Sequence, residues 1–142
     1  FERCRPGGVE EAVTLYRRAV AVEARSWKAA EGHGVHEGPM RRFYEEMIPR
    51  LAATSGVRFT FAWDGERPVG YVMGGVRGDV YRGLQISFDD AYRDLAPGKL
   101  MHLETMRGLV EEGVLAYDLG TDMPYKRAWA ERLVETVPLV VR

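Results

Sequence analysis

Apolar side chains recur every three to four residues in two stretches of the first third of the chain, which is the spacing of amphipathic helices. The first helix is predicted from residue 9 to about residue 28, with apolar positions at Val9, Ala12, Val13, Tyr16, Ala19 and Val20. The second is predicted over residues 39–53, with Met40, Phe43, Tyr44, Met47, Ile48 and Leu51. Both stripes are typical of helices packed on a core.

The middle of the chain alternates apolar and polar residues, the pattern of half-buried strands. Residues 57–63 and 68–76 are predicted to be strands joined by a hairpin turn at Asp64-Gly65. Gly74-Gly75 is expected to bend or bulge the second strand. A turn at Gly78-Asp79 then opens a third strand, which completes an antiparallel meander.

This third strand and the helix that follows it organise the rest of the chain. Leu84, Ile86 and Phe88 alternate with smaller or polar residues, and the helix is predicted from Pro97 to about residue 112. Its apolar stripe is expected at Leu100, Leu103, Met106, Leu109 and Val110. The free N–H groups of residues 98–100 and the helix dipole predict an anion site. The alternative is that Pro97-Gly98 is only a strand-to-helix turn.

The last part of the chain predicts three further elements. Gly113 is expected to end the helix, and residues 114–119 to form a strand. A short helix is predicted over residues 125–134, with Trp129 and Leu133 facing inward, and a last strand over residues 137–141. The order is ααβββαβαβ, which predicts one α/β (α+β) domain over residues 1–142, with a mixed sheet and helices on both faces.

Composition and charge narrow the function classes. The chain has 142 residues and a net charge of −1, with acids and bases interspersed, so nucleic-acid binding is not expected. A single cysteine indicates a reducing compartment, and no apolar run is long enough to span a membrane. His33 and His36 are too closely spaced for one helical face and form no recognisable metal set with a cysteine or acidic residue, so no metal site is expected. Because the first residue is Phe1, we expect the chain to be part of a longer protein.

Several short motifs occur in an order that resembles a known family. They are Ser26-Trp27-Lys28, Asp64-Gly65 followed by Pro68-Val69-Gly70, Pro97-Gly98-Lys99-Leu100, Tyr117-Asp118-Leu119-Gly120, and Pro124-Tyr125-Lys126 with Trp129. Together with the element order they resemble the GNAT acyltransferase fold. More particularly they resemble its FemAB-like branch, in acetyltransferase domains associated with cellulose or exopolysaccharide biosynthesis. The resemblance covers roughly residues 10–135. The family places a strand before the first helix, and none is predicted here.

The resemblance implies an acyl-CoA-dependent N-acyltransferase that transfers acetyl from acetyl-CoA to an amine by direct attack. The pantetheine arm of the donor is expected to pair with the strand edge at Gln85, Ile86, Ser87 and Phe88. The pyrophosphate is expected on the helix start formed by Pro97, Gly98, Lys99 and Leu100. The acceptor class stays open between sugar amines, peptide amines and small metabolites.

Acid–base candidates lie at the C-terminal end of the strand predicted over residues 114–119 and just past it. Tyr125 is the candidate acid for the leaving thiolate, because GNAT enzymes often carry a tyrosine at this place; the alternative is a packing role. Asp118 and Asp122 are candidates for the base or for binding the acceptor's ammonium, although Asp118 can also cap the following loop. His102 is expected to be a surface histidine.

Two other functions are compatible with the same resemblance. The chain can be a non-catalytic pseudo-acyltransferase domain that pairs with a second GNAT-like domain or forms a homodimer, which the unpredicted first strand favours. It can also be a FemAB-type transferase that uses aminoacyl-tRNA, which the lack of basic excess and of a coiled-coil arm disfavours. A cytoplasmic location is expected in each case.

Overall fold

The structure is a computed structural model and describes residues 1–32, 34–35, 37–137 and 139–140. Its helices are α1 (Val9–Glu23), α2 (Trp27–Ala30), α3 (Gly38–Ala53) and α4 (Pro97–Glu111), with short 3-10 helices η1 (Asp90–Leu95) and η2 (Pro124–Lys126). Its strands are β1 (Glu2–Cys4), β2 (Val57–Asp64), β3 (Arg67–Arg77), β4 (Val80–Phe88) and β5 (Ala116–Asp118).

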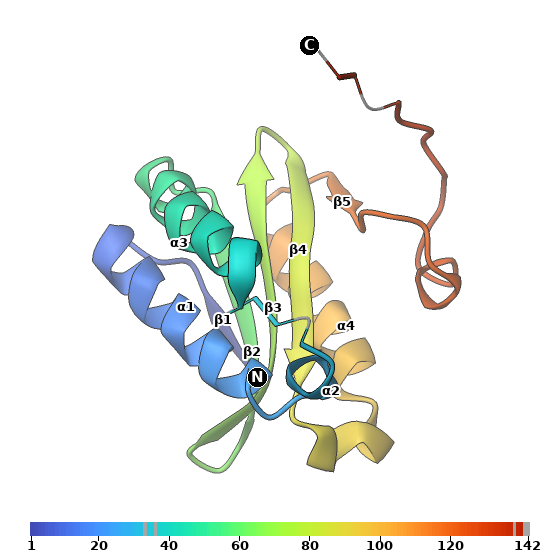
Figure 1. Cartoon of the computed structure of the whole chain (residues 1–142). Coiled ribbons are helices and arrows are strands. Elements are labelled where there is room, and N and C mark those ends of the chain that lie inside the picture. Colours follow the sequence, from blue (N-terminus) through green and yellow to red (C-terminus); the bar gives the residue numbers. More distant parts are fainter. Residues whose placement is uncertain (33, 36, 138, 141–142) are drawn as a thin grey trace.

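The strands form one mixed sheet in the order β1-β2-β3-β4-β5. The pairs from β1 to β4 are antiparallel, and β5 is parallel to β4. Helices α1 and α3 cover one face of the sheet, and α4 covers the other (Figure 1). This arrangement confirms the predicted fold class, a mixed α/β sheet with helices on both faces.

Each face of the sheet has its own apolar core. Phe59 and Phe61 of β2 and Tyr71 and Met73 of β3 are buried against α1 and α3. The alternate residues of the same strands point to the other face, where Met101 of α4 is fully buried. The predicted stripes of α1 and α3 thus mostly face the core, although Val9 of α1 and Met40 and Phe43 of α3 stay exposed.

A buried carboxylate lies inside the larger core. Glu23, the last residue of α1, has no exposed surface. It accepts hydrogen bonds from the backbone N–H of Val35 and the hydroxyl of Tyr71. The hydroxyl of Tyr16 donates to the carbonyl of Val35 over 3.2 Å. These bonds tie the segment before α3 to α1 and β3, and a buried carboxylate needs such partners.

The meander agrees with the sequence prediction. The turns at Gly65 and Gly78 have φ values of 55° and 62°, a region that glycine enters without strain. The register between β3 and β4 shifts between Met73 and Gly74, where a bulge was expected. Helix α4 begins at Pro97, as predicted. The bulge and the helix start both lie next to the candidate site described below.

The first strand and the end of the first helix differ from the prediction. Glu2–Cys4 forms β1, antiparallel to Phe59–Phe61 of β2, although no strand was predicted there. A strand of 3 residues is too short for alternation to show, and its pairing partner lies far along the chain. Helix α1 ends at Glu23 rather than near residue 28, because the backbone turns at Ser26, whose N–H donates to the Glu23 carbonyl.

The predicted apolar stripe of α4 was wrong in part, since Leu109 is buried as predicted but other members are not. Leu100, Leu103 and Val110 are exposed, and the buried face carries Pro97, Met101, His102, Thr105 and Leu109. Thr105 enters the core because its hydroxyl is satisfied there, 2.9 Å from the Thr60 hydroxyl and 2.8 Å from the Met101 carbonyl. Polar residues with such partners are not visible as core positions in an apolar pattern.

The chain after β5 was also predicted wrongly in part. Strand β5 covers only Ala116–Asp118, and the predicted helix over residues 125–134 is reduced to η2. Leu133 is 70% exposed rather than inward. Val137, Leu139 and Val140 are exposed and form no strand, while residues 138 and 141 of that prediction lie outside the described residues. Figure 1 shows this segment leaving the sheet.

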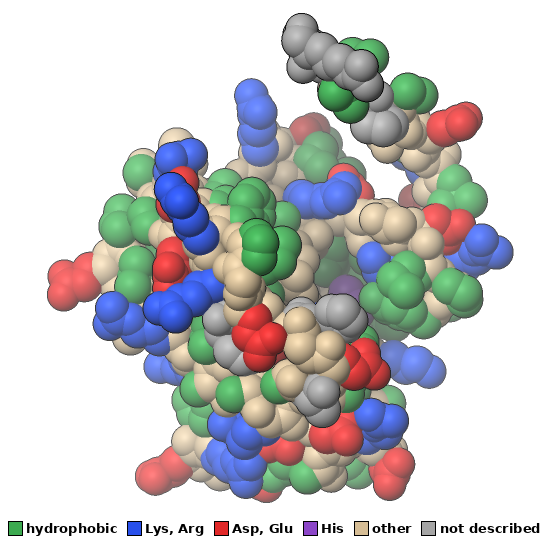
Figure 2. Space-filling view, in the orientation of Figure 1, with side chains coloured by type: hydrophobic (Ala, Val, Ile, Leu, Met, Phe, Trp, Pro, Cys, Tyr) green, Lys and Arg blue, Asp and Glu red, His purple; other side chains and the backbone are tan. Residues whose placement is uncertain are grey.

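Among the described residues, no helix combines the length and the apolar character that crossing a bilayer requires. Acidic and basic side chains alternate over the face shown in Figure 2, with no large surface of one sign. This agrees with the charge distribution expected from the sequence.

Candidate functional site

Strands β4 and β5 part soon after they meet. They pair only through Val80–Ala116, Tyr81–Tyr117 and Arg82–Asp118. From Gly83 to Phe88 the same side of β4 has no strand beside it among the described residues. We call this stretch of β4 the open edge. Its backbone groups can pair with an extended ligand in place of a strand.

The direction of the backbone groups follows from the ladder with β3. The N–H of Asp89 donates to the carbonyl of Val69 over 2.8 Å, so this position points toward β3. Pairing alternates along an antiparallel strand, so Ile86 and Phe88 turn their N–H and carbonyl groups toward the open edge. The Nζ of Lys28 confirms this direction, because it lies 2.7 Å from the carbonyl oxygen of Ile86.

Lys28 belongs to a small polar network beside the open edge, and sequence reasoning gave it no role. Its Nζ also donates to Gln85 Oε1 over 2.8 Å, and Gln85 Nε2 donates to the hydroxyl of Tyr44 over 3.0 Å. Burial lowers the pKa of Lys28, and the nearby carboxylate of Glu23 opposes that shift. The network joins α2, β4 and α3 on the face of the sheet opposite α4.

The start of α4 lies against the other face of the open edge. Pro97 is buried, and Lys99 and Leu100 are exposed. A Cβ placed on Gly98 would lie 3.6 Å from side-chain atoms of both Ile86 and Phe88, an ordinary contact distance. The structure therefore brings together the two sets of residues that the sequence predicted for the donor, Gln85–Phe88 and Pro97–Leu100.

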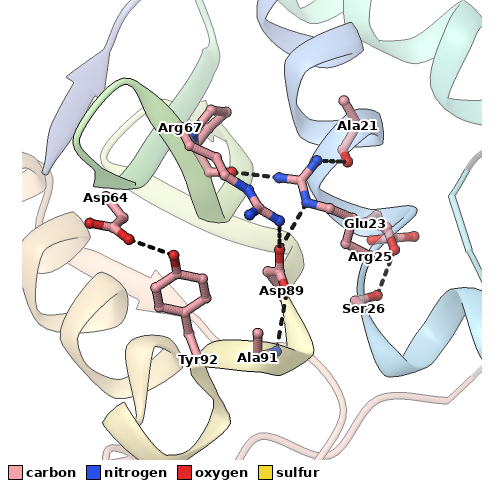
Figure 3. Close-up of polar contacts among 10 residues, drawn as sticks. Ala21, Glu23, Arg25, Ser26, Asp64, Arg67, Asp89, Ala91 and Tyr92 are labelled. Carbon is pink, nitrogen blue, oxygen red and sulfur yellow. Dashed lines mark hydrogen bonds and ion pairs between the residues drawn. The ribbon is translucent and has the colours of Figure 1, made fainter.

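Asp89 fixes the connection between the open edge and α4 (Figure 3). Its side chain accepts hydrogen bonds from Arg25 Nε at 2.9 Å, from Arg67 at 2.6 Å and from the N–H of Ala91 at 3.1 Å. Asp89 is only 4% exposed. Burial alone would raise the pKa of Asp89, but the Ala91 N–H and the two guanidinium groups outweigh it and lower the pKa.

Arg25 adds three further hydrogen bonds to this anchor. It donates to the Pro68 carbonyl over 2.6 Å and to the Ala21 carbonyl over 2.7 Å, and its own carbonyl accepts from the N–H of Asp90 over 3.1 Å. One arginine thus links the end of α1, the start of β3 and the start of η1. The direction in which the chain leaves β4 and enters α4 is set by these bonds.

A tyrosine–histidine pair lies where β5 leaves β4. The hydroxyl of Tyr117 lies 3.1 Å from Nδ1 of His102. His102 is 7% exposed, so its prediction as a surface histidine was wrong. Burial lowers the pKa of His102, helped by the cation of Lys126, and burial raises the pKa of Tyr117, helped by Tyr125. The ring of Trp129 lies 6.2 Å from that of His102, between centroids.

The three predicted acid–base residues lie on the exposed side of the same junction. Asp118 forms an ion pair with Arg82 and accepts from the N–H of Gly120 over 2.8 Å, the loop-capping contact considered from the sequence. Asp122 is ion-paired with Arg127 over 2.8 Å. Tyr125 is 53% exposed. Each carboxylate is bound by a neighbouring arginine, not by a residue of the open edge.

The electrostatics of these groups follow from their neighbours. Burial opposes ionisation of Asp118, but Arg82 and the Gly120 N–H lower its pKa overall. The hydrogen bond from Arg127 lowers the pKa of Asp122. Burial raises the pKa of Tyr125, so its phenol keeps its proton at neutral pH. Among the described residues no cluster of three metal-ligating side chains occurs, and His33 and His36 lie outside them.

The family of the chain follows from a match that covers most of its sequence. Residues 2–127 match the family model described as "Acetyltransferase (GNAT) domain". The chain belongs to the GNAT acetyltransferase family. It is therefore an acetyltransferase domain, and the acyl donor of such a domain is acetyl-CoA. No curated protein matches the chain in sequence.

Solved structures share the GNAT fold with this domain. PaiA N-acetyltransferase of Thermoplasma acidophilum, in complex with coenzyme A, gives a TM-score of 0.57 at 16% identity over 90% of this chain and 84% of that one. The aminoglycoside acetyltransferase meta-AAC0020 from an uncultured soil metagenomic sample, in complex with sisomicin, gives 0.65 at 13% identity over 99% and 95%.

The ribosomal-protein-alanine N-acetyltransferase of Brucella melitensis biovar Abortus 2308 gives a TM-score of 0.59 at 12% identity over 99% of this chain and 96% of that one. At these identities the likeness concerns the fold. It confirms the prediction of a GNAT fold, and strand β1 of this chain supplies the strand before the first helix that the sequence did not reveal.

Proposed function

We propose that this GNAT domain binds acetyl-CoA along the open edge of β4 and transfers its acetyl group to an amine. One observation carries the proposal: the edge from Gly83 to Phe88, beside which no strand lies among the described residues, runs directly beside the N-terminus of α4. An extended amide-containing chain fits such an edge, and a pyrophosphate fits the start of a helix.

The dimensions support this placement. The five residue-to-residue steps from Phe88 to Gly83 span about 17 Å along the strand. This is close to the length of an extended pantetheine arm. With the pyrophosphate at Gly98–Leu100, the arm would pair with the outward groups of Ile86 and Phe88, and the thioester would reach Gly83. Lys99, which is exposed at the helix start, would face the pyrophosphate as a counter-charge.

The reaction needs an amine with a free lone pair. The amine nitrogen bonds to the thioester carbon, the C–S bond breaks with its electron pair on sulfur, and the proton lost by nitrogen goes to a base. We assign Tyr125 as the residue that donates a proton to the departing thiolate, because its phenol is protonated at neutral pH. Asp118 and Asp122 are the candidates for base or ammonium binding, since both stay ionised at neutral pH.

The acceptor we propose is a small-molecule, sugar or peptide amine. The similar folds include enzymes named for aminoglycosides and for a ribosomal protein's alanine. The resemblance to FemAB-like domains of exopolysaccharide biosynthesis favours an amino sugar, in a cytoplasmic setting. The strand that was missing from the sequence prediction is present as β1, which removes the reason for preferring a non-catalytic half-domain.

Charge reversal at the helix start tests donor binding. Lys99→Glu places an anion beside the proposed pyrophosphate, and we expect acetyl-CoA affinity to fall about tenfold. Arg107→Glu makes the same change two turns further along α4, at an exposed position, and should leave the affinity within about twofold. Isothermal titration calorimetry with acetyl-CoA measures both. Equal losses in the two variants would remove the anion site from α4.

A larger side chain at residue 98 tests whether the donor comes close to the start of α4. Gly98→Val is expected to remove most of the rise in melting temperature that acetyl-CoA produces, with little change in the stability of the free domain. Gly98→Ala is the matched control. Its added Cβ would lie 3.6 Å from side-chain atoms of Ile86 and Phe88, which is an ordinary contact distance. Loss of folding in Gly98→Val would instead indicate that the glycine serves only the strand-to-helix turn.

A further inference from the structure

Gly83 marks the place where the open edge begins. It is the first residue of β4 beyond the last pair with β5, Arg82–Asp118. It also lies at the register shift of β4 against β3, where Gly74 pairs with Gly83 and Met73 pairs with Gln85. With the donor placed as proposed above, this is where its sulfur arrives.

The phenol of Tyr117 lies at this place. A Cβ built on Gly83 would lie 3.0 Å from the Tyr117 hydroxyl and 2.8 Å from a carbon of its ring, closer than a side chain can come. Glycine is therefore required at position 83 for the ring to lie over β4. Tyr117 pairs with Tyr81 in the ladder, and the two rings meet edge to face at 4.8 Å between centroids, which fixes the phenol.

His102 holds the hydroxyl from the other side. Its Nδ1 lies 3.1 Å from the Tyr117 oxygen, and His102 is almost fully buried on the inner face of α4. Its pKa is lowered by burial and by Lys126 of η2, so the imidazole is neutral at pH 7 and one ring nitrogen carries a proton. The groups facing it are the phenol of Tyr117, the cation of Lys126 and the ring of Trp129.

We propose that Tyr117 is a catalytic residue of the acetyl transfer, whose O–H donates a hydrogen bond to the sulfur of the departing thiolate while Nδ1–H of His102 donates to the Tyr117 oxygen. His102 is then a positioning residue that selects the direction of the single phenol proton. The inference rests on the proposed function, since it takes the donor to lie along the open edge.

The chemistry of this pair is stabilisation without proton transfer. When the C–S bond breaks, the electron pair stays on sulfur, and the thiolate gains a donor that is already in place. The raised pKa of Tyr117 keeps the phenol protonated, so the sulfur receives its proton separately, from Tyr125 in our assignment. The two hydrogen bonds run in one direction, from imidazole to phenol to sulfur, and so strengthen each other.

The product complex tests this without an acceptor. Coenzyme A labelled with ¹³C at the carbon next to sulfur is bound to the whole domain, and the label is followed by NMR as the pH is raised. A hydrogen bond to the thiolate lowers the pKa of the bound thiol. Tyr117→Phe keeps the ring and removes the donor, so the bound thiol pKa is expected to rise by about one to two units.

Two control variants separate this role from packing. Tyr16→Phe removes a buried hydroxyl from the opposite core, where it donates to Val35, and should leave the bound thiol pKa unchanged. At the histidine, His102→Asn keeps an N–H near the place of Nδ1, whereas His102→Leu has none. We expect His102→Leu to raise the thiol pKa, by less than Tyr117→Phe, and His102→Asn to restore it.

The outcomes are distinguishable. If coenzyme A binds and the thiol pKa is the same in the unchanged domain and Tyr117→Phe, the role of Tyr117 is overturned and the proposed function stands. If His102→Leu and His102→Asn behave alike, the role of His102 is overturned. If coenzyme A at millimolar concentration does not bind the unchanged domain, the proposed function and this inference both fail.

Discussion

The two sides of the proposed site are built in different ways. The donor side consists of β4, η1 and α4, and its inner residues are deeply buried, with Met101 at 0% and Asp89 at 4% exposure. The side that follows β5 is open: Tyr125 is 53% exposed, and further along Leu133 is 70% and Leu139 is 90% exposed. The first is held by the core of the domain, whereas the second is held by exposed ion pairs and by the contact of Trp129 with His102.

The contacts themselves show the same contrast. Asp89 joins Arg25 of the α1 end and Arg67 of β3, residues far apart in the chain. Asp122 pairs with Arg127 five residues away. An anchor of the first kind fixes backbone positions in the whole domain, whereas an exposed local ion pair contributes little to stability. The proposed donor side is therefore positioned by the fold as a whole, and we expect substitutions at the candidate acid–base residues to cost little stability.

The largest expected effect concerns the exposed side and catalysis alone. Tyr125→Phe removes one hydroxyl and keeps the ring, and loss of a general acid typically lowers the rate about a hundredfold or more. The loss should appear in kcat with little change in acetyl-CoA affinity, because the interaction forms mainly in the transition state. Thiol release with a panel of amines, sugars included, measures it. Turnover within about threefold of the unchanged domain would remove Tyr125 from the mechanism.

The next effect concerns stability on the donor side. Asp89→Asn takes the charge from a carboxylate that accepts three charge-assisted or backbone hydrogen bonds, and it should lower the free energy of unfolding by about 2 kcal/mol. Urea unfolding of both proteins measures the difference. A loss no larger than that of an exposed substitution would contradict the anchor role of Asp89.

This difference should depend on pH in a defined way. The pKa of Asp89 is lower in the folded domain than in the unfolded chain. Its stabilisation is therefore complete above the unfolded pKa of about 4 and is lost as the pH falls through the folded value. The gap between Asp89→Asn and the unchanged domain is expected to be constant from pH 5 to 7 and to shrink below about pH 4. A gap that stays constant to pH 2 would contradict the assignment.

The smallest effect returns to the exposed side. Asp122→Asn breaks the pair with Arg127, but both side chains face solvent, so the melting temperature should stay within about 2 °C. Differential scanning calorimetry of this variant beside Asp89→Asn gives the comparison directly. Equal shifts in the two variants would show that the segment after β5 is as firmly integrated as the donor side.

The same contrast explains which parts the sequence could predict. The meander and the start of α4 depend on local signals, such as Asp64-Gly65 and Pro97-Gly98, and these were predicted correctly. In the segment after β5 the ring of Trp129 lies beside His102, but Leu133 and Val137 are exposed, so the apolar pattern there predicted elements that do not form. Local pattern and tertiary context disagree there.

The candidate site was predictable only where it coincides with such local signals. Gln85–Phe88 and Pro97–Leu100 were found because a strand leads into a helix with a glycine at its start. Lys28 was given no role because its partner Ile86 lies 58 residues away, and no spacing rule connects them. His102 was wrongly predicted to lie on the surface. Its burial depends on the contact with Tyr117, which appears only in the folded domain.

The measurement that tests the central claim most directly is amide hydrogen exchange of β4, residue by residue, with and without saturating acetyl-CoA. The N–H groups of Ile86 and Phe88 face the open edge, whereas those of Gln85 and Ser87 face β3 and serve as internal controls. The account predicts that acetyl-CoA slows exchange at Ile86 and Phe88 by at least about tenfold relative to the controls, as an added strand would. Unchanged exchange at both amides in a domain saturated with acetyl-CoA would contradict it.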